Sequence, residues 1–415
     1  MALHRCGDTG EPVKLALICG AISVLIAVCA FVALEYVTLK LPKLVISPDA
    51  PLAERTRALE DWFDALEHAR KFNGTVLIAR GGITVFERHV GFADAATGRA
   101  ITSNTSFNLA SVSKHITAFA VLLLAHEGKL SLHDPLVRHI PELGRHDGVT
   151  LDHLLSHTSG IPDYARSRNL AKRLERDGDI LTPAKLIAWL AATDEGPMFT
   201  PGEKENYSNS NYALLAEIVA RVSGQSFAGF LQSRLFTPLG MHRTAVVNGI
   251  ENTSLLEDRA LGFRRRFLYF GSDVPDDLNR FDGVAGDGNI YASARDLIIW
   301  DQALRRGALM PAEAYEPAYA PRRLANGEII QETVLGKTLQ PGLGWNVQDF
   351  PIVTSYGLWQ GFSNFYWRDL ENGTTLVVLS NAGIFLRTVM IGEKLVEFAQ
   401  TLSADQQQGS TSVQP

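Results

Sequence analysis

The sequence predicts an α/β fold of the α+β type, in which an antiparallel sheet flanked by helices adjoins a mainly helical second region. Strand-like runs lie toward both ends of the chain, at 74–78, 84–90, 342–347, 362–369 and 375–380. Helical periodicity dominates the middle, from Leu151 to about Phe236. Strands at both ends with helices between them predict that the two ends pair in one sheet.

The individual elements follow from local patterns. The first is an amphipathic helix whose apolar side chains recur at helical spacing: Leu59, Trp62, Phe63, Leu66 and Ala69. Glycine-containing turns at 80–82 and 372–373 predict hairpins between the first two and the last two strands. Further helices are expected from Ser111 to near Gly128, from Ala294 onward, and at the end of the fold through 389–398.

Composition restricts the kind of protein. With 415 residues, 46% of them apolar and 20% charged, the chain has the profile of a folded globular protein with a large core. A net charge of −6 and the absence of a long basic run argue against nucleic acid as a partner. Cysteines occur only at Cys6, Cys19 and Cys29, so the bulk of the chain can form no disulfide and no thiolate metal site.

The N-terminal part predicts a membrane anchor. After the segment 1–14, the run Leu15–Leu34 carries no charge and is long enough to cross a bilayer as a helix. We therefore expect a single transmembrane helix over 15–37 and a proline-punctuated linker over 38–53. The folded domain then spans 54–402, with its helical region at about 130–290.

Two alternatives to an anchor stay open. A cleaved signal peptide is less favoured because the apolar run is unusually long and no small-x-small cleavage site follows it. Lipidation of Cys29 is weaker still because Val28 stands where a small residue is expected. Lysines flank the run on both sides, so its orientation is not determined by charge. At the other end, 403–415 is polar and is expected to be disordered.

Ser111 and Lys114 form the candidate catalytic pair. They lie three residues apart at the start of a predicted helix, so the ammonium comes one turn after the hydroxyl. A serine hydroxyl is a weak nucleophile unless a neighbouring group removes its proton, and a helix N-terminus favours the negative charge that develops on attack. This spacing is the only Ser-x-x-Lys in the chain, although alone it also fits a capped helix with a surface lysine.

Tyr207-Ser208-Asn209 is the second candidate motif, and it is the only Tyr-x-Asn in the chain. A nearby ammonium favours the anionic form of a phenol, so Tyr207 could accept the serine proton. Asn209 could hold the lysine and a substrate amide.

With these residues in this order, the chain resembles the serine β-lactamase and penicillin-binding-protein-like hydrolases, in the branch of class C β-lactamases, esterases and D-aminopeptidases. The likeness covers about 72–381. Its further shared segments are Phe72-Asn-Gly-Thr-Val-Leu77, Leu132-His-Asp-Pro135, Ile140-Pro-Glu-Leu143, Leu154-Leu-Ser-His-Thr-Ser-Gly-Ile-Pro162, Pro201-Gly202, Leu239-Gly-Met241, Gly286-Asp-Gly288 and Ala294-Arg-Asp-Leu297. The resemblance implies a β-lactamase/transpeptidase-like fold and catalysis by Ser111, Lys114, Tyr207 and Asn209 without a cofactor.

The third motif of that family is altered here. The family has Lys or His, a small residue and Gly, with Gly-Phe four residues later, and Gly361-Phe362 therefore places the motif at Ser355-Tyr356-Gly357. The Gly is kept and the cation or imidazole is missing, which puts binding of a substrate carboxylate in doubt. Lys337-Thr338-Leu339 lacks the Gly and is interpreted as a coincidence. The resemblance also implies an oxyanion hole formed by the backbone N–H groups of Ser111 and Leu358.

Histidines are weaker candidates. His153 and His157 are four apart, but no glutamate at metalloprotease spacing accompanies them, and His157 belongs to the His-Thr-Ser-Gly turn. His115 should point away from Lys114 on a helix. No metal site is predicted.

Together these features predict a membrane-anchored, single-pass serine hydrolase that acts through an acyl-enzyme, with its catalytic domain periplasmic or extracellular. The resemblance implies ester or amide substrates, including small molecules, D-amino-acid peptides and β-lactams. The alternative is a catalytically weakened module on the same fold that binds peptide or lipid without turnover. An active-site-directed phosphonate or a fluorescent penicillin distinguishes the two.

Overall fold

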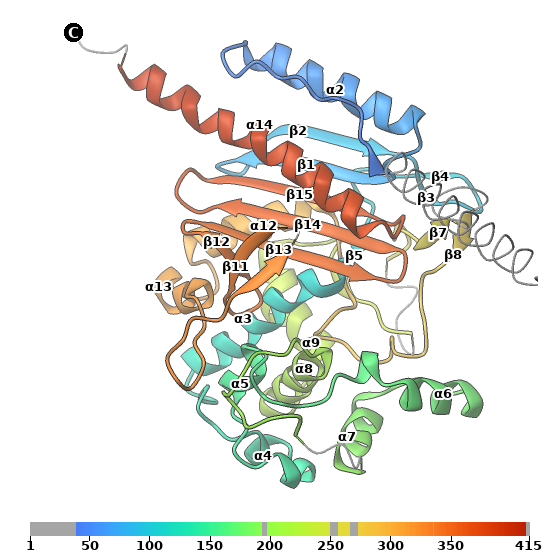
Figure 1. Ribbon diagram of the computed structural model, residues 1–415, viewed down its shortest axis with the longest axis vertical. Helices are drawn as coiled ribbons and strands as arrows, with labels where there is room; N and C mark the ends of the chain where they lie inside the picture. The colour runs from blue at the N-terminus through green and yellow to red at the C-terminus, as the bar shows by residue number, and fades with distance from the viewer. Residues whose placement is uncertain (1–38, 193–196, 250–255, 266–272, 335, 412–415) are drawn as a thin grey trace, which may run out of the picture.

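A computed structural model describes residues 39–192, 197–249, 256–265, 273–334 and 336–411 of the chain (Figure 1). Its central element is an eight-stranded antiparallel sheet in the order β10-β11-β12-β13-β14-β15-β1-β2. The strands are β1 (Gly74–Arg80), β2 (Ile83–Val90), β10 (Glu332–Val334), β11 (Lys337–Pro341), β12 (Asn346–Asp349), β13 (Ile352–Trp359), β14 (Phe362–Asp369) and β15 (Thr374–Ser380).

The two ends of the chain meet in the middle of this sheet. Strand β1 pairs antiparallel with β15, with Gly74 opposite Ser380 and Arg80 opposite Thr374. The predicted mixed fold, with an antiparallel sheet built from both ends of the chain, is confirmed. Short sheets add β3 (Phe92–Asp94), β4 (Arg99–Ala100), β5 (Phe107–Asn108), β6 (Ala245–Val246), β7 (Phe263–Arg265), β8 (Asp273–Pro275) and β9 (Ile290–Ala292).

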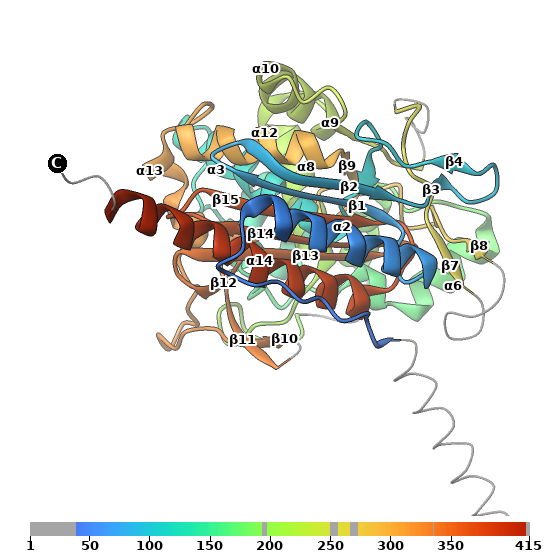
Figure 2. The same cartoon turned by 90° about the horizontal axis from the view of Figure 1, so that it is seen from above.

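Helices cover both faces of the sheet. Helices α2 (Leu52–His68) and α14 (Phe385–Thr411) lie side by side on one face (Figures 1 and 2). Val76 and Ile78 join their apolar cluster, whereas Leu77 belongs to the cluster on the opposite face, which contains residues of α3 (Ser113–His126) and α12 (Ala294–Arg306). This alternation is the two-residue period of a strand that is buried on both sides.

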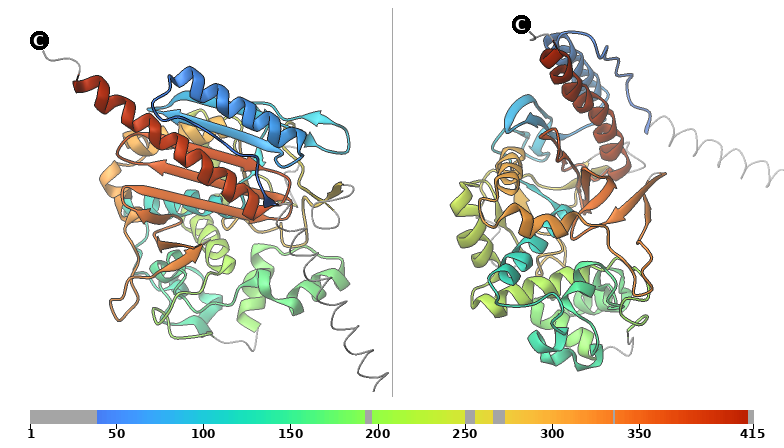
Figure 3. Two further views of the ribbon diagram at one scale, coloured as in Figure 1. Left: turned by 45° about the horizontal axis from the view of Figure 1, so that its top comes forward. Right: turned by 90° about the vertical axis from the view of Figure 1, so that its left-hand side faces the viewer.

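The helical region lies beyond the second face, on the side away from α2 and α14 (Figure 3). It contains α4 (Leu136–His139), α5 (Leu151–Leu155), α6 (Arg168–Asp177), α7 (Pro183–Ala192), α8 (Asn209–Ser223), α9 (Phe227–Leu231) and α10 (Thr237–Leu239), and α13 (Ala312–Tyr315) follows α12. Helix ends follow local rules: the Ser293 hydroxyl caps α12 by accepting from the Asp296 N–H, and Gly307 ends it in a left-handed conformation.

The structure differs from the sequence-based expectations at three places. The expected strand 342–347 is interrupted because Gly344, at φ +74°, passes the His115 backbone so closely that a Cβ would lie 2.6 Å from it. Ser111 lies in a 3₁₀ turn, and α3 begins only at Ser113. Helix α14 continues to Thr411, into the segment expected to be disordered from Ser403, and no proline interrupts it.

The predicted anchor at 15–37 lies outside the described residues. Within the part of the chain that the structure describes, no helix combines the length and the apolar character needed to span a membrane.

Candidate active site

The backbone before the nucleophile is held by asparagines. The Asn108 side-chain oxygen accepts the Ala110 N–H at 2.8 Å, and Ala110 adopts a left-handed φ of +50°. The Asn108 carbonyl in turn accepts from the Asn364 side chain of β14 at 2.9 Å. This strained turn places Ser111 at the entrance to α3, where its side chain faces a cavity of about 350 Å³.

Lys114 is nearly buried, with 3% of its surface exposed. Its ammonium donates to Ser111 Oγ at 3.2 Å, to Asn209 Oδ1 at 3.0 Å and to the Asp287 backbone carbonyl at 2.7 Å. An ammonium has three N–H donors, so all three have acceptors. These three contacts hold the Lys114 side chain in place beside Ser111.

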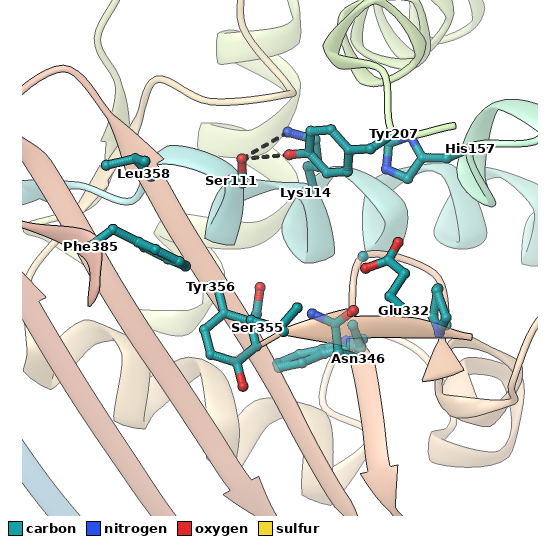
Figure 4. A pocket seen from close by; sticks show the side chains of 15 residues that line it. Ser111, Lys114, His157, Tyr207, Glu332, Asn346, Ser355, Tyr356, Leu358 and Phe385 are labelled. Atoms are coloured by element: carbon teal, nitrogen blue, oxygen red, sulfur yellow. Dashed lines mark hydrogen bonds between the residues drawn. The ribbon is translucent and has the colours of Figure 1, made fainter. Parts of the chain in front are cut away.

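Tyr207 approaches Ser111 from the start of α8. Its phenol oxygen lies 2.6 Å from Ser111 Oγ, and Lys114 Nζ lies 4.9 Å from the centre of its ring (Figure 4). The imidazole ring of His157 packs against the Tyr207 ring, with the two ring centres 4.5 Å apart. The serine hydroxyl is thus placed between a phenol and an ammonium, the two groups that can take its proton and stabilise the resulting charge.

Asn209 is oriented by a buried carboxylate. Its side-chain amide nitrogen donates to Asp163 Oδ2 at 3.3 Å, so its oxygen is left to accept from Lys114. The Asn209 backbone N–H also donates to Asp163. Burial raises the pKa of the Asp163 carboxyl, and the charge of Lys114 opposes this shift.

Asp287 has a similar supporting position. Its backbone carbonyl accepts from Lys114, and its carboxylate accepts from the Tyr164 hydroxyl. Burial raises the pKa of Asp287 and Lys114 acts in the opposite direction. Asp163 and Asp287 were not among the predicted site residues; Asp287 lies in the Gly-Asp-Gly segment of the resemblance, but nothing in the sequence shows that its carbonyl reaches Lys114.

The altered third motif lies on β13, along the cavity. Ser355, Tyr356 and Leu358 line the cavity together with Ser111. A Cβ at Gly357 would lie 2.4 Å from the Leu109 carbonyl, so only glycine lets β13 pass the turn that carries the nucleophile. The structure thus brings Leu358 to the side of the cavity where Ser111 lies (Figure 4), and the oxyanion hole remains a prediction.

Among the described residues that line the cavity, Lys114 is the only lysine or arginine. Lys337, interpreted as a coincidence, lies on β11 and forms an ion pair with Glu393 of α14. Two carboxylates that the sequence analysis missed lie at this site: Glu332 of β10 lines the cavity, and Glu205 contacts it. No sequence signal marks Glu332, because β10 was not predicted.

The candidate histidines His153, His157 and His115 have other contacts in the structure. Burial lowers the pKa of His157 to about 3, with a smaller effect from Lys114, so its ring is neutral; its Nδ1 accepts the Ser208 N–H at 3.2 Å. His153 caps α5 by accepting the Thr150 N–H, and His115 packs among aromatic rings away from the cavity. In the described part of the chain, no group of three His, Cys, Asp or Glu side chains could hold a metal ion.

Comparisons with known proteins give matches over most of the chain. The family model described as Beta-lactamase matches residues 59–390. The chain is 33% identical over 340 residues to penicillin-binding protein 4* of Bacillus subtilis (strain 168), covering 79% of this chain and 72% of that protein. It is 34% identical over 210 residues to esterase EstB of Burkholderia gladioli, covering 48% of this chain and 53% of the esterase.

Solved structures are similar over most of the chain. A penicillin-binding protein from Bacillus halodurans superposes with a TM-score of 0.67 at 25% identity, covering 80% of this chain and 99% of that one. The match thus extends over four fifths of this chain and nearly all of the solved protein.

Proposed function

The chain belongs to the beta-lactamase family and is a serine hydrolase, and on this premise we propose that Ser111 forms an acyl-enzyme with ester or amide substrates. The observation that carries the proposal is the position of Ser111 Oγ, 2.6 Å from the Tyr207 hydroxyl and 3.2 Å from Lys114 Nζ. A nucleophile needs a proton acceptor and a stabilising charge, and these two neighbours supply them.

The hydrogen bonds indicate which of Lys114 and Tyr207 accepts the serine proton. Lys114 uses its three N–H groups as donors, so the phenol oxygen of Tyr207 is the better candidate for the proton acceptor. In acylation, Tyr207 must be in its phenolate form: the bond from Ser111 Oγ to the carbonyl carbon forms, the serine hydroxyl proton passes to the phenolate oxygen, and the carbonyl oxygen takes the negative charge. The bond to the leaving group then breaks, and the leaving group takes that proton.

Deacylation repeats these steps with water. Water gives a proton to Tyr207 as its oxygen attacks the acyl carbon, and the ester bond to Ser111 breaks as Oγ recovers a proton. During both attacks the negative charge on the carbonyl oxygen would be held by the N–H groups of Ser111 and Leu358.

Substrates are proposed to be esters or amides, among them D-amino-acid peptides and β-lactams. The similarity to an esterase and to penicillin-binding proteins supports this range. Because Ser355 replaces the cation of the third motif, we expect weak β-lactamase and carboxypeptidase activity beside measurable esterase activity.

The test is covalent labelling of Ser111. A fluorescent phosphonate or penicillin should label the wild type and fail to label Ser111→Ala. Ser113→Ala is the matched control, because it removes a hydroxyl two residues away. The Ser113 Oγ accepts from the Ile290 N–H and does not line the cavity. A wild-type protein that binds peptide or lipid but is never labelled would support the non-hydrolytic alternative.

We further propose that residues 15–37 anchor the protein in a membrane with the catalytic domain outside the cytoplasm. The uncharged run at 15–34 supports this. Protease added to intact spheroplasts should digest the domain. Protection that disappears only after lysis would place the domain on the cytoplasmic side.

A further inference from the structure

One carboxyl group lines the wall of the cavity at the edge of the sheet, and a second carboxyl group outside the cavity contacts it. Glu332 of β10 lines the cavity together with Ser111, although the two residues are far apart in sequence. Glu205, in the loop before α8, is hydrogen-bonded to Glu332. Figure 4 shows the Glu332 carboxylate turned toward the side where Tyr207 and His157 lie. A substrate bound at Ser111 therefore shares its cavity with an acidic side chain.

No cavity-lining cation balances this pair. Among the described residues of the cavity wall the only cation is Lys114, whose donors are committed to Ser111, Asn209 and Asp287. Arg166 lowers the pKa of Glu205 only as a minor influence, and it does not line the cavity. The Oε1 atom of Glu205 is shielded from solvent and accepts no hydrogen bond from the described residues. The pair thus keeps both negative charge and unused acceptor capacity.

The two carboxyl groups influence each other's ionisation. Burial, followed by the charge of Glu332, raises the pKa of Glu205 to about 7, and burial also raises the pKa of Glu332. Two adjacent carboxyl groups cannot easily both ionise, so one of them can hold a proton while the other is charged.

We propose that Glu332, supported by Glu205, is a specificity-determining residue that makes this active site reject substrates with a carboxylate and favour substrates with a cationic amine, neutral substrates being intermediate. The proposal rests on the proposed hydrolysis at Ser111. The proposal also accounts for Ser355 at the third motif. With Ser355 there, the cavity lacks the cation that would attract a carboxylate, and Glu332 would repel a carboxylate. Each unit of substrate charge should change kcat/KM by about tenfold, the size of a charge interaction across several ångströms at a partly solvated site.

The experiment uses three esters with the same phenol leaving group and the same acyl chain, ending in trimethylammonium, in a neutral methyl group or in carboxylate. The wild type should hydrolyse them in the order cationic, neutral, anionic, with a ratio of about a hundred between the first and the last. Glu332→Gln should reduce this ratio to about ten or less. Ratios between esters cancel any general loss of activity in the variant.

Glu328→Gln is the matched control, because Glu328 is exposed, lies four residues before Glu332 and does not line the cavity. It should keep the wild-type ratio. Equal rates for the three esters in the wild type, or an unchanged ratio in Glu332→Gln, would overturn charge selection. Hydrolysis of the neutral ester that is lost in Ser111→Ala would in that case still support the proposed function. If the wild type hydrolyses none of the esters and Ser111 takes no phosphonate label, both proposals are wrong.

Discussion

Replacing Tyr207 with phenylalanine removes one hydroxyl and leaves the surrounding packing in place. The ring keeps its contact with His157, at 4.5 Å between ring centres, and its position 4.9 Å from Lys114 Nζ. What is lost is the oxygen 2.6 Å from Ser111 Oγ. The variant therefore tests the proton acceptor separately from the shape of the site.

The expected loss is large for catalysis and small for stability. A positioned general base contributes about 10²- to 10⁴-fold, which is roughly 3 to 5 kcal/mol in the activation free energy. One hydrogen bond contributes about 0.5 to 1.5 kcal/mol to the free energy of unfolding. Tyr207→Phe should therefore lower kcat for a neutral ester by at least about a hundredfold while changing stability by about 1 kcal/mol.

Tyr212→Phe is the matched control. Tyr212 lies on α8 next to the same His157, is fully buried, and donates its hydroxyl to the Leu155 carbonyl at 2.9 Å without touching Ser111. Its loss should cost about 1 to 3 kcal/mol of stability, because a buried carbonyl loses its donor, and change kcat only a few-fold. Ester hydrolysis and urea unfolding measured on both variants separate the two effects. A Tyr207→Phe protein within fivefold of wild-type kcat would refute the assignment of Tyr207 as proton acceptor.

Three further changes have defined outcomes. Ser355→Lys should raise the rate of acylation by a carboxylate-bearing penicillin about ten- to a hundredfold relative to a neutral ester, since a charge-assisted hydrogen bond contributes about 1.5 to 3 kcal/mol; an unchanged ratio of labelling rates would show that another group supplies the charge. Because Glu205 has a pKa of about 7 in the folded protein against 4.5 unfolded, its proton stabilises the native state at acid pH, and this contribution is lost as pH rises from 4.5 to 7. Glu205→Gln should remove that part of the pH dependence. The free energies of unfolding of wild type and variant, measured in urea, should therefore differ more at pH 8 than at pH 5, with the variant more stable. An equal difference at both pH values would contradict the raised pKa of Glu205. Asp301→Asn should lower the free energy of unfolding by about 3 to 5 kcal/mol, measured from the urea midpoint. Arg368 is 1% exposed and donates to Asp301 at 2.6 Å, so in the variant its buried charge would lack that carboxylate. A loss below about 1 kcal/mol would contradict this reasoning.

The features that depend on neighbours in sequence were predictable. The strand predicted at 362–369 is β14, and the turn at 372–373 joins it to β15, because side-chain alternation and turn conformation are local properties. The Ser111 and Lys114 spacing and the Tyr207 motif are local in the same sense. Their meeting in one site was expected from the resemblance, and the structure brings all four side chains together.

Tertiary structure alone decided the environment of that site. The carbonyl of Asp287 that accepts from Lys114, and the Glu332 carboxyl group that lines the cavity, come from segments more than a hundred positions from the residues they meet. No periodicity or spacing encodes such contacts, because they depend on how β10 and the loop before β9 pack against residues distant in sequence. The charge of the cavity follows from these packed neighbours, since burial removes the water that would otherwise screen each group from the next.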